Sequence, residues 1–287
     1  MSDLLPWDAM AKVANNLIDK GDKMIDRLSN FFVWCVNHDT PNRIALDTYI
    51  SDIQNSDMDP LTKAVLISNA KKTIKEYKNQ CDIVTIAKKS INPDAQPDEV
   101  DEDWLAQFMD KARLVNNEEL KFIWGRLLSG EINVPQSIPK VLLHIIEQMD
   151  TDAAHDFMAV SNTTIKVFDD GKWEYEPLIF LKRLSLEYYK ERGITFDSLI
   201  ELEALGLIHY NPTTYFQASH ESKTIYFNDI AYDTQEARRS NLLLGNVLFT
   251  NAGRALFSVI EAERDSEYLN DLINAHWAEF NATKIIL

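Results

Sequence analysis

The sequence predicts a mainly α-helical protein, in which a helical domain over residues 1–160 precedes a smaller α+β domain over residues 161–287. Two observations support this prediction. Apolar residues recur every three or four positions through 101–150, which is the period of an amphipathic helix. From residue 163 the sequence reads TTIKVFDDGKWEY, two β-prone runs joined at Asp170-Gly171, and this is a strong hairpin signal. A chain of 287 residues, 45% of them hydrophobic, can bury the cores of two domains.

Four helices are expected before residue 91. The first two are predicted over 4–18 and 22–36, and the run from Asp39 to Asn42 ends the second. The next two are predicted over 43–53 and 61–90, and a break near Asn79 is left open. The last of these helices has the most basic surface of the chain, formed by Lys71, Lys72, Lys75, Lys78, Lys88 and Lys89. A solvated helix face is the usual reason for such a run, and a site for an acidic partner or a phosphate backbone is the alternative.

Three short helices are predicted over 101–150. The first begins at the acidic run Asp101–Asp103, which suits the positive end of a helix dipole, and carries Trp104 on its apolar face. The second has Asn117 as its N-cap and Gly130 where a left-handed C-cap is expected. The third opens with Ser137 and Pro139. Their apolar faces are expected to form a compact helical core.

The same stretch contains the segments DEDWLAQFMD and EELKFIWGRLLSGEINVP, preceded by KNQCDIVTIAKKS at 78–90. It resembles a bacterial domain-of-unknown-function family whose hallmark is an Asp-Trp start, here Asp103-Trp104, followed by a W-G-R-x-L-x-G-E box, here Trp124–Glu131. The resemblance covers about residues 78–160. The family has no established activity, but helical domains of this type recur among candidate phage-defence and abortive-infection proteins. A defence role is therefore what the resemblance implies.

Four residues of this stretch are candidates for an interaction site or a structural role: Trp104, Trp124, Arg126 and Glu131. Trp124 is expected in the core. Arg126 and Glu131 could form an ion pair, buried or at an interface, that fixes the helix turn.

The C-terminal part is expected to alternate helices and strands. Helices are predicted over 177–192, ended by Gly193, and over 198–205, capped by Thr195 or Asp197 and closed by Gly206. Strands are predicted over 207–210, 223–227 and 246–250, and Asn251 is expected to cap the helix that follows. A last helix through Tyr268 and Phe280 leads to an apolar tail, 284–287, which either enters the core or contacts a second chain.

The pattern of this part resembles a winged helix. The residues that match it are Leu199, Leu202, Leu205, Gly206, Leu207 and Ile208, then Phe249, Thr250, Gly253, Arg254 and Leu256. The intervening segment, about 211–245, is longer than a simple wing and is interpreted as a hairpin insertion. The candidate recognition helix contains Asp197, Glu201 and Glu203 but no Lys or Arg, so DNA binding is not expected. Arg238 and Arg239 in the insertion are candidate partner contacts.

Charge and composition narrow the function classes. The net charge of −16 and pI of about 4.8 disfavour binding to nucleic acid and to anionic membranes. Cys35 and Cys81 lie in apolar helical patterns, which favours buried thiols and a reducing cytoplasm. No secretory signal is recognised, and the longest apolar run, 31–36, is far shorter than the roughly 20 residues that span a bilayer. We therefore expect a soluble cytoplasmic protein without a membrane span.

No catalytic, cofactor-binding or metal site is expected from the motifs. Phosphate-binding loops, zinc-protease motifs and nucleophile elbows are all missing from the sequence. The pairs His144 with Glu147 and His276 with Glu279 have the reverse order of a di-iron motif, and the acidic run 98–103 lacks the pattern of a calcium loop.

The hypothesis favoured by the sequence is a non-catalytic interaction protein that binds a protein partner or forms a homo-oligomer. A winged-helix transcription regulator is the first alternative. The second is an enzyme with an unrecognised site, using His155 and Asp156 together with residues of the other domain.

Overall fold

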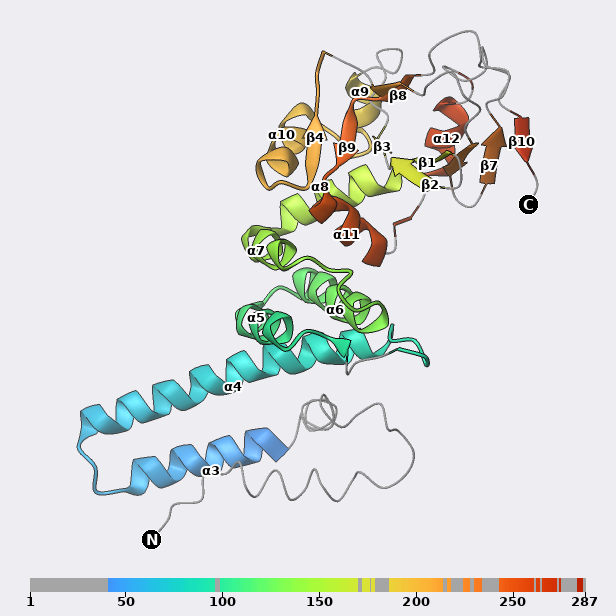
Figure 1. The fold of residues 1–287 in the computed structure, drawn as a ribbon. Coiled ribbons are helices and arrows are strands. Elements are labelled where there is room, and N and C mark those ends of the chain that lie inside the picture. Colours follow the sequence, from blue (N-terminus) through green and yellow to red (C-terminus); the bar gives the residue numbers. More distant parts are fainter. Residues whose placement is uncertain are drawn as a thin grey trace. The chain divides into compact units, whose positions relative to one another are not determined.

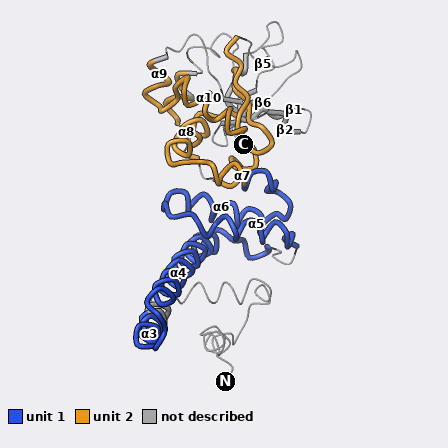
Figure 2. The backbone as a smooth tube through the Cα atoms, turned by 90° about the vertical axis from the view of Figure 1, so that its left-hand side faces the viewer, with its two compact units in different colours: residues 1–143 blue, residues 144–287 orange. Residues whose placement is uncertain are grey.

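The computed structural model of the chain describes residues 41–95, 99–169, 172–175, 177–178, 186–213, 216–217, 224–227, 230–233, 243–260, 262–263, 265–272, 274 and 283–285. The chain divides into two compact units, residues 1–143 and 144–287 (Figure 2). The division falls inside helix α7 (Lys140–Gln148), ahead of the boundary near Ser161 that the sequence predicts. The helix over 151–162 belongs with the second unit because it packs against a helix over 196–204.

Helices dominate the described residues, as predicted (Figure 1). The helices are α3 (Pro41–Asn55), α4 (Pro60–Lys88), α5 (Glu102–Ala112), α6 (Glu118–Asn133), α7 (Lys140–Gln148), α8 (Thr151–Asn162), α9 (Leu186–Lys190), α10 (Phe196–Ala204), α11 (Asn251–Val259) and α12 (Ser266–Leu272). The strands are β1 (Lys166–Asp169), β2 (Lys172–Tyr175), β3 (Pro177–Leu178), β4 (Ile208–Tyr210), β5 (Phe216–Gln217), β6 (Thr224–Phe227), β7 (Ile230–Asp233), β8 (Leu243–Gly245), β9 (Val247–Phe249) and β10 (Thr283–Ile285).

In the first unit, α3 and α4 form an antiparallel hairpin, and α5 and α6 pack on the second half of α4 (Figure 1). Asp59 caps α4 by accepting hydrogen bonds from the amides of Leu61 and Thr62. The helix then continues without the break that was considered near Asn79. The buried residues of α4 all lie between Asn79 and Ala87, so its first half carries no core residue.

The three helices predicted over 101–150 are present, and the predicted cap Asn117 is confirmed. Asp101, the first residue of the predicted acidic run, is the N-cap of α5. The prediction for Gly130 is wrong. Gly130 lies inside α6, which continues to Asn133 because Ile132 and Glu131 are buried in the next turn. The core of this unit contains an aromatic cluster in which Phe108 stacks on Trp104 and meets Trp124 edge-on, with both ring centroids 5.1 Å from its own.

The second unit contains the predicted hairpin, because β1 pairs antiparallel with β2 and Asp169 opposes Lys172. These strands belong to a five-stranded sheet of order β10-β7-β6-β1-β2. The helix predicted over 177–192 is wrong in its first part, because Pro177–Leu178 is strand β3 and only Leu186–Lys190 is helical among the described residues. Leu178 pairs with Val247 of β9, so sheet pairing overrides the helical pattern there.

A second sheet has the order β3-β9-β4 and packs with α8, α10 and α11. Thr195 caps α10, as predicted, and Gly193 and Gly206 adopt the left-handed conformation where helices end. The cap of α11 is Thr250 rather than the predicted Asn251. A Cβ at Gly253 would lie 2.0 Å from the carbonyl oxygen of Leu207, so this position of α11 requires glycine.

The described part of the apolar tail belongs to strand β10. β10 pairs antiparallel with β7 at the edge of the five-stranded sheet, with Lys284 opposite Tyr232. The helices predicted over 4–18 and 22–36, Cys35 and residues 275–280 lie outside the described residues.

Candidate functional site

Two residues of the first unit hold the connection between α6 and α7. The indole Nε1 of Trp104 donates a hydrogen bond to the carbonyl oxygen of Ile138 at 2.9 Å. The carboxylate of Glu131 accepts from the amide of Ile138 at 2.9 Å and from the amide of Gln136 at 2.7 Å. The Asp-Trp start and the end of the Trp124–Glu131 box therefore meet at one residue of the connection. We call these contacts the Ile138 clamp.

The Glu131 side chain is buried, with only 1% of the residue exposed. Burial raises the pKa of this carboxyl above its ordinary value, and the hydrogen bonds from Ile138 and Gln136 reduce the shift without cancelling it. Gln136 has a φ of 67°, which is unusual for a residue other than glycine. The carboxylate thus compensates for a strained turn by satisfying two of its amides.

Gly125 and Arg126, in the Trp124–Glu131 box, pack against α4 and the residues that follow it. A Cβ at Gly125 would lie 2.5 Å from Cγ2 of Ile86 and 3.1 Å from the carbonyl oxygen of Ile83, so glycine allows the two helices to approach closely. Arg126 donates to the hydroxyl of Ser90 and lies 5.7 Å above the ring of Phe122. The contacts described for Arg126 and Glu131 are with different groups, and the ion pair between them stays a prediction.

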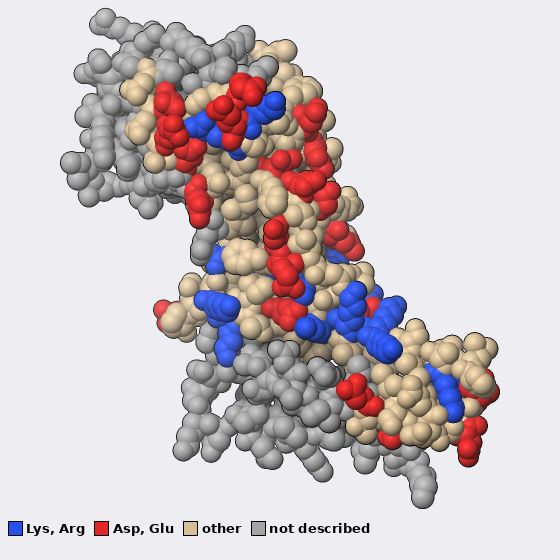
Figure 3. All heavy atoms as spheres, turned by 180° about the vertical axis from the view of Figure 1, so that it is seen from behind, with Lys and Arg blue, Asp and Glu red and all other residues tan. Residues whose placement is uncertain are grey.

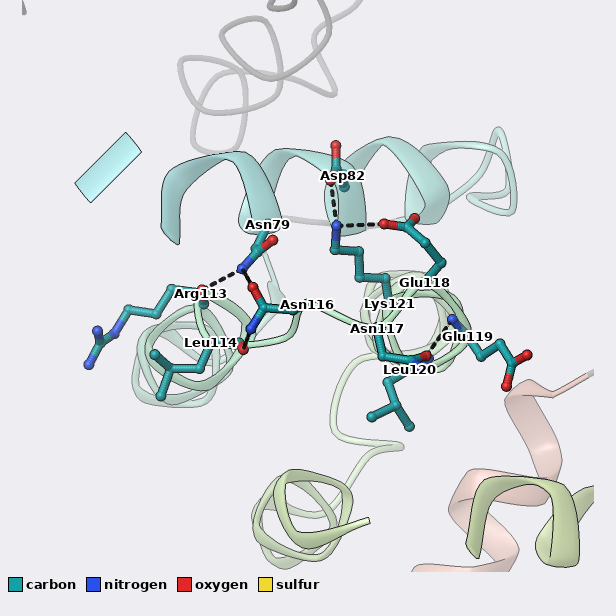
Figure 4. Close-up of polar contacts among 10 residues, drawn as sticks. All are labelled: Asn79, Asp82, Arg113, Leu114, Asn116, Asn117, Glu118, Glu119, Leu120 and Lys121. Atoms are coloured by element: carbon teal, nitrogen blue, oxygen red, sulfur yellow. Dashed lines mark hydrogen bonds and ion pairs between the residues drawn. The ribbon is translucent and has the colours of Figure 1, made fainter. Parts of the chain in front are cut away.

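A buried lysine joins α6 to α4 (Figure 4). Lys121 is only 4% exposed, and its ammonium lies 2.6 Å from the carboxylate of Asp82 and 2.9 Å from that of Glu118. Burial alone would lower the pKa of Lys121, but the hydrogen bonds to Asp82 and Glu118 outweigh it and raise this pKa. Lys121 therefore stays charged and fixes the register of the two helices.

The turn between α5 and α6 is tied to α4 by amides (Figure 4). The Nδ2 of buried Asn79 donates to the carbonyl oxygen of Arg113 at 3.0 Å and to Oδ1 of Asn116 at 3.3 Å. Asn116 in turn donates to the carbonyl oxygen of Leu114. Asn79 thus joins α4 to the turn between α5 and α6, and α4 is continuous at this residue.

The part of α4 before Asn79 carries a surface that we call the basic strip: Leu61, Val65, Lys71, Lys72, Lys75 and Lys78. Leu61 is 74% exposed and Val65 is 50% exposed, and all four lysines are exposed. Leu61, Val65 and Lys72 are spaced at i, i+4 and i+11 and share one face, while Lys71, Lys75 and Lys78 lie beside it. Figure 3 shows basic side chains gathered over α4.

The second unit carries a surface of opposite charge that sequence reasoning missed, the acidic ridge: Asp152, Phe196, Asp197, Ile200 and Glu201. Phe196 is 57% exposed and Ile200 is 44% exposed, one helical turn apart on α10. Asp152, Asp197 and Glu201 are exposed as well. Leu199 and Leu202 form the buried face of α10. The spacing of Phe196 and Ile200 out of register with these leucines is the signal that could have found the ridge.

The carboxylates of the acidic ridge lie close enough to a neighbouring carboxyl, that of Asp156, to raise its pKa. The pKa of Asp156 on α8 is raised by burial and then by the negative charges of Glu201 and Asp152. Red side chains predominate over α8 and α10 in Figure 3. A basic group placed there by a partner would relieve this repulsion.

A cluster of aromatic and charged side chains joins α9 to α12. The hydroxyl of Tyr188 donates to Asp271 at 2.8 Å, and Arg192 stacks 3.8 Å above the Tyr188 ring while pairing with Asp265 at 2.8 Å. Burial, followed by the hydrogen bond to Asp271, raises the pKa of Tyr188. These contacts tie α9 to α12, and the phenol stays neutral.

The remaining candidates of the sequence are placed only in part. Arg238, Arg239, His276 and Glu279 lie outside the described residues. His144 Nδ1 is 4.0 Å from the Glu147 carboxylate on the exposed side of α7, and His155 is exposed on α8. Within the described ranges, no group of three or more His, Cys, Asp or Glu side chains could hold a metal ion. Of the helices that the structure describes, none is long and apolar enough to cross a membrane.

Comparison with known proteins gives one match. The model of a family described as "Protein of unknown function (DUF2806)" matches residues 68–273, from the middle of α4 to just beyond α12. The matched segment contains the Ile138 clamp, Lys121 and the acidic ridge. No curated protein and no solved structure matches the chain.

Proposed function

The chain belongs to the DUF2806 family of proteins of unknown function, and we propose that it is a non-catalytic interaction protein of the cytoplasm. It acts through contacts with another protein or with its own copies, as a component or regulator of bacterial phage defence. The acidic ridge carries this proposal, because an exposed Phe196–Ile200 pair beside carboxylates suits a protein partner. The defence setting rests on the resemblance of the Trp124–Glu131 box.

The arrangement around α10 supports a winged-helix-like unit. Helix α8, strand β3, helices α9 and α10, strands β4 and β9 and helix α11 follow in that order, and β9 lies between β3 and β4 in the sheet. In a DNA-binding winged helix, the helix in the position of α10 would enter the major groove. Asp197 and Glu201 would then approach phosphates with like charge. We infer that the unit uses the same helix for a protein.

The test is purification of the tagged full-length chain from its native host, before and during phage infection. We expect a stoichiometric protein complex whose partner is lost in the variant with Phe196→Ala and Ile200→Ala. The variant with Leu114→Ala and Phe122→Ala is the matched control, because it removes exposed apolar side chains from another surface. Turnover by the purified chain that disappears when one polar residue is changed would reject the proposal.

A transcription regulator is the second candidate, and the order of β3, β9 and β4 around α10 favours it. Duplex binding by such a protein weakens steeply as salt rises, because counterions are released from the phosphates. Sequence-specific, salt-sensitive binding by the wild-type chain, lost in Phe196→Ala, would replace the protein-contact proposal with this one.

A further inference from the structure

The chain carries two exposed surfaces that are complementary in charge and alike in apolar content. The basic strip has four lysines beside Leu61 and Val65, and the acidic ridge has three carboxylates beside Phe196 and Ile200. Lys72 lies 3.8 Å from Glu76, and within the described part of the chain no ion pair is found for Lys71, Lys75 or Lys78.

We propose that the acidic ridge of one molecule binds the basic strip of a second copy of this chain. The proposal rests on the proposed function and names the partner of the same ridge. The exposed lysines of the strip and the exposed carboxylates of the ridge are complementary in charge, so the two patches attract each other locally although each copy carries a net charge of −16. The apolar pairs Leu61–Val65 and Phe196–Ile200 supply the area that is removed from water.

Helical geometry allows the contact. Leu61 and Val65 are one turn apart on α4, and Phe196 and Ile200 are one turn apart on α10, so each pair forms a short apolar ridge of about 6 Å at 1.5 Å per residue. Two such ridges pack when the helices cross. Lys71, Lys72 and Lys75 follow within roughly 15 Å of Val65 along α4, which is within reach of carboxylates that flank a crossing helix.

The two surfaces are different patches, so the contact is head-to-tail. In a dimer held by this contact, one strip and one ridge stay free, so further copies can bind. The copies form a closed ring if the rotation between neighbours closes, and an open filament if it does not. The assembly should grow with protein concentration and weaken with salt, because exposed charge pairs are screened.

The experiment measures the mass of the purified full-length protein by sedimentation velocity across concentration and salt. Two charge-reversal variants are compared. One carries Lys71→Glu, Lys72→Glu and Lys75→Glu on the strip, and the other carries Asp197→Lys and Glu201→Lys on the ridge. The variant with Lys88→Glu and Lys89→Glu is the matched control, because it reverses exposed lysines at the other end of α4. Circular dichroism melting confirms that each variant folds.

We expect the wild type to form species larger than the 33.0 kDa monomer, with an association constant that falls about tenfold or more from low to high salt. Each reversal alone should be monomeric, the control should associate like wild type, and an equimolar mixture of the two reversals should associate again. Monomeric wild type at every concentration, or a mixture that stays monomeric, would overturn the proposal. A changed sedimentation shape at constant monomer mass would also overturn it.

These outcomes are separate from those of the proposed function. The purified chain contains no host protein, so its failure to associate rejects the second copy as the partner and nothing more. The complex isolated from the host, with its Phe196→Ala and Ile200→Ala variant, decides whether the ridge binds a different protein.

Discussion

The indole of Trp104 and the carboxylate of Glu131 bind the two backbone polar groups of the same residue, Ile138. Trp104 Nε1 donates to the carbonyl oxygen of Ile138, and Glu131 accepts from its amide, each at 2.9 Å. Because Ile138 lies just before α7, these two bonds fix where the third helix of the central stretch begins. Trp104 and Glu131 were candidates for an interaction site. In the structure, both side chains position the connection between α6 and α7.

Glu131→Gln should destabilise the first unit by about 1–3 kcal/mol, because a carboxamide presents one acceptor to two buried amides. The cost is measured by urea denaturation followed by circular dichroism. Glu119→Gln, a change to an exposed residue of the same helix, is the control and should cost little.

The same carboxyl predicts a pH dependence. Its pKa is raised in the folded state, so the folded protein binds the extra proton between the ordinary value of 4.5 and the raised value. The stability contributed by protonation is present below pH 4.5 and is lost as the pH rises through the raised pKa. The stability of wild type relative to Glu131→Gln should therefore decline over that window. A difference that grows with pH would contradict the raised pKa.

Trp104→Phe should cost about 1–3 kcal/mol, because it removes the donor to the buried carbonyl of Ile138 and keeps an aromatic ring beside Phe108. Combined with Glu131→Gln it should be non-additive, since both bonds hold one residue. A double-mutant cycle in urea measures this coupling. Strict additivity would show that the two bonds act independently.

Trp124→Ala should cost about 3–5 kcal/mol, because it leaves a large cavity beside Phe108 in the aromatic core. Phe122→Ala on the same helix is the control, since Phe122 is 47% exposed and lies outside the aromatic core. Thermal melting distinguishes the two. An unchanged melting temperature in Trp124→Ala would refute the core assignment.

The helices with a continuous apolar period could be predicted from the sequence, because periodicity reports burial directly. The end of α6 could not, because Gly130 carries a C-cap signal while the burial of Glu131 and Ile132 continues the helix. Strand β3 was also missed, because its pairing with β9 depends on residues far away in the sequence. Long-range pairing of this kind leaves no local pattern.

The candidate site was predictable only in part. Trp104 and Trp124 are buried as their apolar stripes indicate. The role of Glu131 depends on the turn at Gln136, and the pairing of Lys121 depends on Asp82 in another helix. A charged residue on an apolar face gives the same sequence signal whether it is solvated or paired. The acidic ridge was not predicted because apolar residues occur on the exposed as well as the buried side of α10, and the sequence does not tell which side faces solvent.

Gly125→Ala should destabilise the first unit by about 1–3 kcal/mol, although alanine favours a helix by about 1 kcal/mol over glycine. The new Cβ would lie 2.5 Å from Cγ2 and 2.8 Å from Cβ of Ile86, and the latter atom cannot rotate away. Ile86→Ala removes Cγ2, so the double variant should lose less than the sum of the two single costs. A stabilising Gly125→Ala would show that α4 and α6 separate at little cost.

Asp82→Ala should destabilise the protein more than Lys121→Met does. Removing Asp82 leaves the buried ammonium with Glu118 alone, whose side chain is 79% exposed, whereas methionine replaces the buried lysine with an apolar chain of similar length. We expect about 2–3 kcal/mol for Asp82→Ala and about 1 kcal/mol or less for Lys121→Met. Because the pKa of Lys121 is raised, its contribution is present below its ordinary value of 10.5 and is lost as the pH rises through the raised pKa. The gap between wild type and Lys121→Met in urea should therefore close only in strong alkali, and a gap that closes near pH 8 would show that the lysine is not held by Asp82.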